Sequence, residues 1–185
     1  MQRRILENYL GKVHGRTHAI ERSALALLYK LTTIRGTPGI HCNKPPSFVL
    51  YTYRDQRGVV VGSLIYYKHA FTSPAHGPRF AGWCEMAVAK LHQRQGIAMQ
   101  LLARANEELD LKPFEQAYSP EGYLLMCKFL GLPQLPIDEL RAKAAKAKFG
   151  TLALHCPAEA ETVSQAASMG KVSDGAIHPG SPLLG

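Results

Sequence analysis

Hydrophobic residues first recur at spacings of three and four in the stretch THAIERSALALLYKLT. Its apolar positions gather on one side of a helical wheel, while Arg22 and Lys30 lie elsewhere on the wheel. This spacing predicts an amphipathic helix over residues 17–33. The next stretch, RGTPGIHCNKPPS, contains three prolines and two glycines, so we expect a loop there.

The following segments have the composition of β-strands. SFVLYTYRD and GVVVGSLIYYKHAF are rich in Val, Ile and Tyr, and a turn-like DQRG separates them, which predicts an antiparallel hairpin. TSPAHGPRF is expected to be a second loop. AGWCEMAVAKL then predicts a third strand, and a charged amphipathic helix is expected from about Ile97 to Leu109.

Two further helices and a tail are expected after residue 110. KPFEQAYS is a candidate for a short strand, and PEGYLLMCKFLG is a helix with Pro120 in its first turn and Gly131 where it stops. In PIDELRAKAAKAKFG the acidic residues come early and the lysines late, which suits the dipole of a helix. The final stretch is small, polar and glycine-rich. It offers little apolar area to offset the cost of ordering it, so we expect a mobile tail.

These elements indicate one domain with appendages. At 185 residues and 46% hydrophobic content, the chain is long enough for one well-packed core and short for two. We expect a basic N-terminal segment over residues 1–16, the folded domain over 17–135, a basic helix over 136–150 and the mobile tail over 151–185.

Charge and cysteine content limit the classes of function. The chain has 22 Lys and Arg against 14 Asp and Glu, a net charge of +8, which favours a polyanionic ligand or partner. The cysteines, Cys42, Cys84, Cys127 and Cys156, are too widely spaced to suggest a zinc site or a disulfide framework. We also find neither a membrane-spanning apolar run nor a secretory signal. We therefore expect a soluble cytoplasmic protein with reduced thiols and no membrane contact.

The turn QRQGIA, residues 93–98, begins a helix without a Ser, Thr or Asp cap. Such a start leaves several N–H groups without partners and carries partial positive charge, so it can receive an anion such as phosphate. Gly96 lets the backbone approach closely, and Ala98 keeps the first turn thin. Gln93 and Arg94 can add side-chain donors. An ordinary tight connection is the alternative interpretation of so short a motif.

The segment MAVAKLHQRQGIAMQLL resembles the acetyl-CoA-binding motif of the GNAT family of N-acetyltransferases. That motif is an apolar strand ending in Val, a Gln or Arg five residues later, then x-x-Gly-x-Gly/Ala and a helix. Val88 stands five residues before Gln93, and residues 93–98 fit each defined position. The order of elements over residues 17–132 is also similar. The resemblance implies an α/β (α+β) fold, a twisted mixed sheet flanked by helices, whose splayed central strands bind acetyl-CoA.

The resemblance assigns mainly backbone roles to the cofactor site. The pantetheine arm would pair with Met86, Ala87 and Val88, in the space between their strand and a strand near residues 114–118. The Val88 amide would polarise the thioester carbonyl. The pyrophosphate would lie on the amides of Arg94, Gln95, Gly96, Ile97 and Ala98, with Gln93 beside them.

The catalytic side chains depart from the family pattern. Members commonly place a Tyr four residues before the Gly that ends a later helix, and Cys127 stands there, with Tyr123 one turn earlier on the same face. Either could protonate the leaving thiolate, and either could instead pack in the core. Glu85 is the candidate base that would deprotonate an incoming ammonium. It could also bind a cationic acceptor or pair with Arg79.

The resemblance implies an enzyme that transfers the acetyl group of acetyl-CoA directly to an amine on a protein or small molecule, without a metal. A protein amine is our first expectation. The basic first 35 residues and the cluster RAKAAKAK would also suit an RNA or acidic protein partner, and hence a toxin-like acetyltransferase acting on aminoacyl-tRNA. A non-catalytic binding module with the GNAT fold is the other alternative, because Tyr is missing at Cys127.

Overall fold

The computed structural model describes residues 18–74, 77–147 and 150–155. The predicted basic segment 1–16 and the tail from residue 156 lie outside the described residues. Over the described part, no helix is long and apolar enough to cross a membrane.

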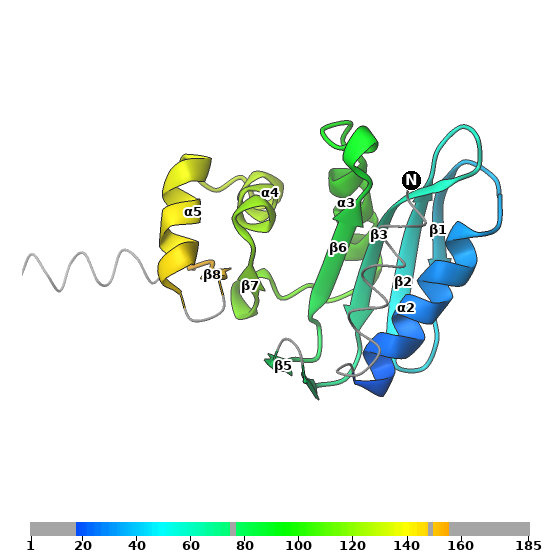
Figure 1. The fold of residues 1–185 in the computed structure, drawn as a ribbon, viewed down its shortest axis with the longest axis horizontal. Helices are drawn as coiled ribbons and strands as arrows, with labels where there is room; N and C mark the ends of the chain where they lie inside the picture. The colour runs from blue at the N-terminus through cyan, green and yellow to red at the C-terminus, as the bar shows by residue number, and fades with distance from the viewer. Residues whose placement is uncertain (1–17, 75–76, 148–149, 156–185) are drawn as a thin grey trace, which may run out of the picture.

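A four-stranded antiparallel sheet forms the centre of the protein, in the order β1-β2-β3-β6 (Figure 1). Its strands are β1 (Gly39–Asn43), β2 (Phe48–Arg54), β3 (Val60–Tyr67) and β6 (Cys84–Val88). The predicted hairpin and third strand are confirmed. The loop predicted around β1 is wrong in its middle, because Gly39–Asn43 pairs with β2 as an edge strand. The prolines that suggested a loop fall outside these five residues, where they remove no hydrogen bond from the ladder.

Helices cover both faces of the sheet. α2 (Ala19–Thr32) packs through Ala24 and Leu28 on one face, and α3 (Ile97–Glu108) packs through Leu101 on the other. Both helices lie where the spacing of apolar residues predicted them. Because side chains alternate between two covered faces, β2 and β3 are buried at nearly every position, which explains why apolar residues predominate in both strands.

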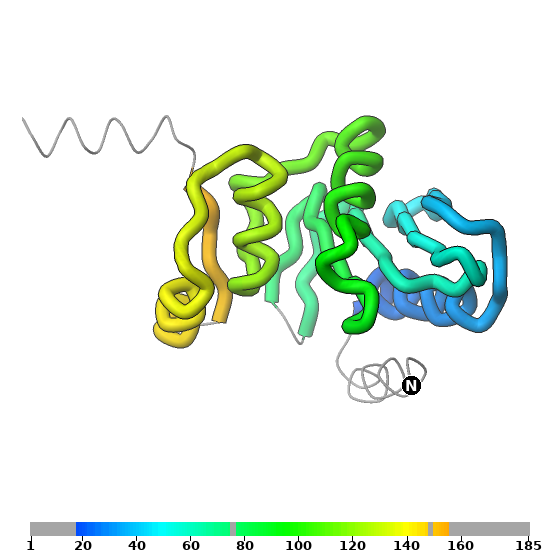
Figure 2. Tube along the Cα trace, turned by 90° about the horizontal axis from the view of Figure 1, so that it is seen from above, coloured from blue at the N-terminus to red at the C-terminus, as the bar shows by residue number. Residues whose placement is uncertain are grey.

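A second block of structure lies beside β6 (Figure 2). It contains β7 (Ala117–Tyr118), α4 (Pro120–Leu130), α5 (Ile137–Lys146) and β8 (Leu152–Ala153). Both predicted helices are present, and α4 ends at Gly131 with a φ of 68°. The tail predicted from residue 151 is wrong at its start, because β8 pairs with β7 and Leu154 is buried. A two-residue strand is too short to show an apolar period.

Short elements complete the described chain. β4 (Phe71–Ser73) and β5 (Gly77–Arg79) pair with each other, and all their residues except Phe71 fall in the second predicted loop, which is therefore partly wrong. Two 3₁₀ turns, η1 (Lys90–His92) and η2 (Pro113–Glu115), precede α3 and β7. These elements are three residues long and leave no periodic signal in the sequence.

Arg54 joins the end of α2 to the β2–β3 turn. It is 5% exposed, and its guanidinium donates to the carbonyl oxygens of Ile34 at 2.6 Å, Gly58 at 2.8 Å and Leu31 at 3.1 Å. Carbonyl groups at a helix end have no intrahelical partner, so this buried cation satisfies groups that would otherwise be costly to bury.

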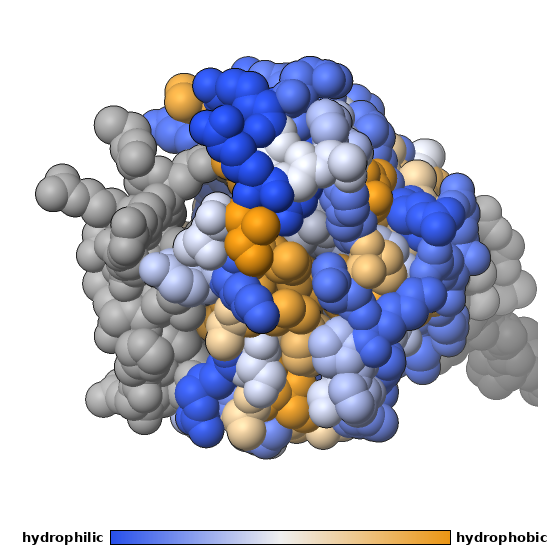
Figure 3. Space-filling view, turned by 90° about the vertical axis from the view of Figure 1, so that its right-hand side faces the viewer, coloured by the Kyte–Doolittle hydropathy of each residue, from blue (hydrophilic) through white to orange (hydrophobic). Residues whose placement is uncertain are grey.

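The outer side of the sheet, beyond β1, is mostly hydrophilic, with an apolar strip through its middle (Figure 3). Large exposed hydrophobic residues are few in the described part of the chain: Ile34, Phe80, Leu91 and Phe114. Phe80 and Leu91 flank β6, so the sheet edge opposite β1 is the place to look for a site.

Candidate functional site

The turn after β6 presents an uncapped helix start. Gly96 is the N-cap of α3 with φ 78° and ψ 0°, and no side chain among the described residues caps this end. Arg94 also has a positive φ, 61°, a conformation that is uncommon for a residue other than glycine. The chain therefore coils tightly before Ile97, and the uncapped helix start that the sequence predicted is confirmed. That its amides receive an anion stays a prediction.

Gly62 allows α3 to begin close to the sheet. It pairs with Val88 across β3 and β6. A Cβ atom at Gly62 would lie 2.7 Å from Cγ2 of Ile97 and 3.3 Å from Cδ1 of Leu101. The missing side chain thus places the helix start directly beside the end of β6. Sequence reasoning did not single out this glycine, because its role depends on a contact across 35 residues.

The register of β6 leaves alternate peptide groups without a partner in β3. The Ala89 N–H donates to the Val61 carbonyl at 2.8 Å, and the Tyr67 N–H donates to the Trp83 carbonyl at 2.9 Å. Hydrogen-bonded and non-hydrogen-bonded pairs alternate along an antiparallel ladder. The peptide groups of residues 84, 86 and 88 therefore point away from β3. We call these groups the free edge of β6.

The free edge corrects one part of the predicted pantetheine site. The expectation of an added strand along β6 fits Met86 and Val88, whose peptide groups face outward. Ala87 pairs with Ser63 in register, so its N–H and C=O point toward β3 instead. Only every second residue of a strand can serve a ligand on one edge, and the sequence did not show which residues those would be.

Side-chain amides occupy both ends of the free edge. Gln116 accepts from the Cys84 N–H at 2.9 Å, and Gln93 donates to the Val88 carbonyl at 3.2 Å. The Met86 peptide and the Val88 N–H stand between them. Gln93 was expected to donate to phosphate, and in this structure its amide instead closes the turn onto the end of β6.

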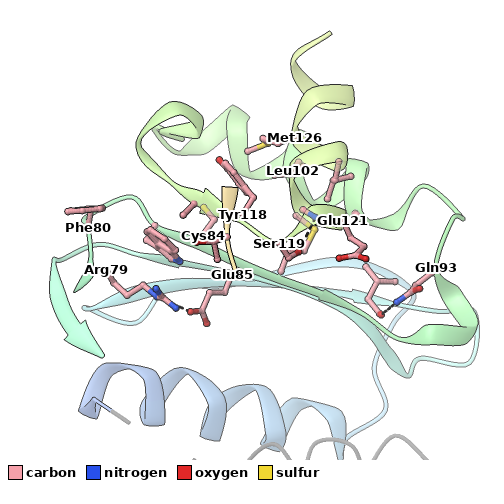
Figure 4. A pocket seen from close by; sticks show the side chains of 18 of the residues that line it. Arg79, Phe80, Cys84, Glu85, Gln93, Leu102, Tyr118, Ser119, Glu121 and Met126 are labelled. Atoms are coloured by element: carbon pink, nitrogen blue, oxygen red, sulfur yellow. Dashed lines mark hydrogen bonds and ion pairs between the residues drawn. The ribbon is translucent and has the colours of Figure 1, made fainter. Parts of the chain in front are cut away.

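A groove of about 700 Å³ runs along the free edge, between β6 and the block of β7 and α4 (Figure 4). Met86 and Val88 line one wall, and Tyr118, Leu125 and Met126 line the other. Gln93 and Ala98 lie at one end, and Arg79, Phe80 and Trp83 lie at the opposite end. The groove therefore joins the open amides of α3 to an aromatic end about one strand length away.

Glu85 lies at the aromatic end, on the side of the sheet that faces α2 (Figure 4). Its carboxylate accepts from Arg79 Nε at 3.3 Å and from the Tyr67 hydroxyl at 3.1 Å. The Arg79 guanidinium lies 4.4 Å from the centre of the Trp83 ring. The pair with Arg79 was one of the alternatives that the sequence left open. Since the Glu85 side chain is 29% exposed, its carboxylate can still meet a ligand.

Tyr123 and Cys127 are not among the residues that line the groove. Cys127 is 1% exposed and lies in the core. Burial and the neighbouring Cys127 raise the pKa of Tyr123. Tyr123 is also close enough to α5 that the positive charge of Lys143 offsets part of this rise in pKa. The groove side of α4 is formed by Gly122, Leu125 and Met126 instead. Which side of α4 faces β6 depends on the docking of α5, which the sequence does not show.

The thiol in the groove is Cys84. Burial raises its pKa to about 12, and it donates to the Gly82 carbonyl at 3.6 Å. The nucleophilic form of cysteine is the thiolate, so Cys84 is a poor nucleophile at neutral pH. Tyr118 also lines the groove, and its hydroxyl donates to the Pro113 carbonyl at 2.7 Å. Within the described residues no group of His, Cys, Asp and Glu could hold a metal ion.

The geometry can be compared with known proteins. A family model described as the acetyltransferase (GNAT) family matches residues 18–116. The chain belongs to this family. GNAT proteins are acyltransferases that typically use acetyl-CoA, and the open amides, the free edge and the groove fit such a ligand. No curated protein and no solved structure matches the chain.

The GNAT match places the sheet, the turn and Gln116 inside the family region, and α4 and α5 beyond it. The predicted family and fold class are confirmed. The ladders among the described residues are all antiparallel, so the mixed sheet that the resemblance implied is wrong in this respect. β7 pairs with β8 and not with β6, and the splay expected of the GNAT fold lies between β6 and β7.

Proposed function

We propose that this GNAT protein is an N-acetyltransferase that moves the acetyl group of acetyl-CoA directly to a primary amine. The observation that carries the proposal is the groove. It has an uncapped helix start at one end, a strand edge whose Met86 peptide and Val88 N–H face away from β3, and a carboxylate at the other end.

Acetyl-CoA would lie along the groove as a co-substrate. Its pyrophosphate would meet the amides of residues 94–98, where the small Ala98 side chain leaves room. Its extended arm would add to the free edge through Met86 and Val88. The Met86 N–H, which lies nearer to Glu85 than the Val88 N–H expected from the sequence and also faces away from β3, would donate to the thioester oxygen as that atom gains negative charge.

Glu85 would receive the proton of the incoming ammonium. The neutral nitrogen then attacks the carbonyl carbon of the thioester, the C–S bond breaks, and CoA leaves as a thiolate. The nitrogen loses its second proton as the tetrahedral intermediate collapses, and this proton passes through solvent to the CoA thiolate, which becomes the thiol. No tyrosine on α4 is needed for this step, which suits the position of Tyr123 and Cys127 away from the groove lining.

Direct transfer is favoured over an acetyl-cysteine intermediate. A covalent route would need a thiolate in the groove, and burial keeps the Cys84 thiol protonated, with a pKa of about 12. The amine therefore attacks acetyl-CoA itself.

An amine carried on a protein is the acceptor that we propose first. Phe80 is 51% exposed at the aromatic end, where Pro78 also lines the groove, so this end has an open apolar rim. Such a rim suits an amine that is carried on the surface of a protein. A cytoplasmic location and an RNA or acidic protein partner, both expected from composition, remain predictions.

The test is release of CoA thiol from acetyl-CoA with a panel of acceptors: a lysine peptide, a peptide N-terminus, a polyamine and an aminoacyl-tRNA. We expect turnover with a peptide amine and a loss of about 100-fold in Glu85→Gln. Glu107→Gln, an exposed change on α3, is the matched control. Turnover only with aminoacyl-tRNA would favour the toxin-like alternative. Cofactor binding without turnover on any acceptor would favour a non-catalytic module.

A further inference from the structure

Gln116 is a buried polar residue that the proposed mechanism does not use. It is 5% exposed. Its side-chain oxygen accepts from the Cys84 N–H at 2.9 Å, and its nitrogen donates at 3.2 Å to the carbonyls of Gly82 and Lys112. Each of these contacts is to backbone, so one side chain satisfies peptide groups from both sides of the splay.

These contacts lie where the two walls of the groove meet. Gln116 comes directly before β7, and Cys84 is the first residue of β6. The two segments are close here, since a Cβ atom at Gly82 would lie 3.3 Å from Cδ of Lys112. Beyond this point, Met86 and Tyr118 face the groove from opposite walls.

We propose that Gln116 is a positioning residue that sets the width of the groove at the point where β6 and β7 diverge. Paired strands lie about 4.8 Å apart. The Gln116 amide takes the Cys84 N–H that a neighbouring strand would otherwise bind, and so places a side chain between the two segments. β6 and β7 are therefore already apart at the point where they start to diverge, and the Met86 peptide stays accessible to a ligand.

The alternative is that Gln116 only stabilises the fold. Two substitutions separate these roles. Gln116→Met keeps the length of the side chain and removes its hydrogen bonds. Gln116→Glu keeps the acceptor for Cys84, but once ionised it faces the carbonyls of Gly82 and Lys112 with no hydrogen to donate. Gln56→Glu, in the exposed β2–β3 turn, is the matched control for added charge.

The measurement is the Kd of acetyl-CoA for each full-length protein between about pH 5.5 and 8.5, with the thermal midpoint recorded at each pH. We expect Gln116→Met to stay folded and bind about tenfold more weakly. We expect Gln116→Glu to bind like the wild type at low pH, where its carboxyl is protonated. It should weaken by about tenfold as the pH rises and the carboxylate forms.

Other titratable groups surround this position and could add their own pH dependence. They are the Cys84 thiol and Glu85 on β6, Tyr66 on β3, Asp110, Lys112 and Glu115 before β7, and Tyr118 on β7. The wild type and Gln56→Glu carry the same groups, so each variant is compared with them at the same pH. Only the difference in Kd between a Gln116 variant and these two proteins at the same pH is attributed to Gln116.

Amide hydrogen exchange at Cys84 gives a second readout that needs no ligand. We expect this amide to be protected in the wild type and to lose protection in Gln116→Met. The proposal is overturned if both variants bind acetyl-CoA like the wild type at every pH, or if affinity falls only in step with the folded fraction. The inference rests on the proposed function. A wild type that binds no acetyl-CoA would refute both, whereas binding with indifferent variants would refute this inference alone.

Discussion

Gly62→Ala should displace the start of α3. The added methyl group would lie 2.7 Å from Cγ2 of Ile97, a distance at which one of the two must move. Overpacking of a core costs about 1 to 3 kcal/mol. Replacing glycine in a strand returns up to about 1 kcal/mol through the entropy of the unfolded chain. Because a contact of 2.7 Å is severe, we take the upper part of the cost, about 2 to 3 kcal/mol, and the net loss of stability should be about 1 to 2 kcal/mol.

The assay is thermal unfolding together with acetyl-CoA titration. For a chain of this size, 1 kcal/mol corresponds to about 2 to 4 °C, so the midpoint should fall by roughly 2 to 8 °C. Because Ile97 is the first residue of α3, next to Gly96, acetyl-CoA should also bind more weakly. An affinity equal to that of the wild type would mean that the contact between residues 62 and 97 does not influence the cofactor site.

The change Ile97→Leu provides the control. Leucine has no methyl branch on its Cβ, so the atom that meets the new side chain at position 62 is removed while the volume is kept. The double variant should recover most of the lost stability. Losses that simply add in the double variant would refute the reasoning, because residues in contact should show a coupling energy.

Three further predictions follow from particular contacts. Arg54→Met should destabilise the protein by roughly 3 kcal/mol in denaturant unfolding, because buried carbonyls lose a charged donor, and a loss below about 1 kcal/mol would contradict this. Glu121 lines the groove, where its negative charge opposes the binding of the anionic acetyl-CoA, and it pairs with Arg141 at 3.1 Å. Glu121→Gln removes this charge and should therefore tighten acetyl-CoA binding a few-fold. Arg141→Ala should weaken that binding only while Glu121 is present, and equal effects in both backgrounds would argue against the pair. Cys84 should alkylate slowly at neutral pH and faster as pH rises toward its pKa of about 12, and peptide mass spectrometry showing it as reactive as exposed Cys42 would be contrary.

The longer elements could be predicted from the sequence because their apolar spacing reflects burial. The apolar stripe of α3 and the mainly apolar runs of β2 and β3 indicate which residues face the core. β1 and β8 could not be predicted in this way, since they are held by pairing with β2 and β7 rather than by their own composition. Prolines near β1 even argued against it.

The candidate site was predictable only where the chain itself forms it. The turn at Gly96 is local, so its uncapped helix start follows from residues that are neighbours in sequence. Gln116, Gly62 and the position of Tyr123 depend on which elements pack together. A single glutamine or glycine forms no sequence pattern from which such a contact could be predicted.

The most direct test of the central claim is titration calorimetry of acetyl-CoA with Ala98→Glu and Ala98→Gln. Ala98 lies in the groove beside the open amides, and the two variants differ only in charge. If phosphate binds there, a carboxylate about 5 Å away should cost roughly 1 to 3 kcal/mol, which raises Kd by about fivefold to 150-fold relative to Ala98→Gln. Equal affinities in the two variants would mean that the phosphates bind elsewhere, and the proposed cofactor site would be wrong.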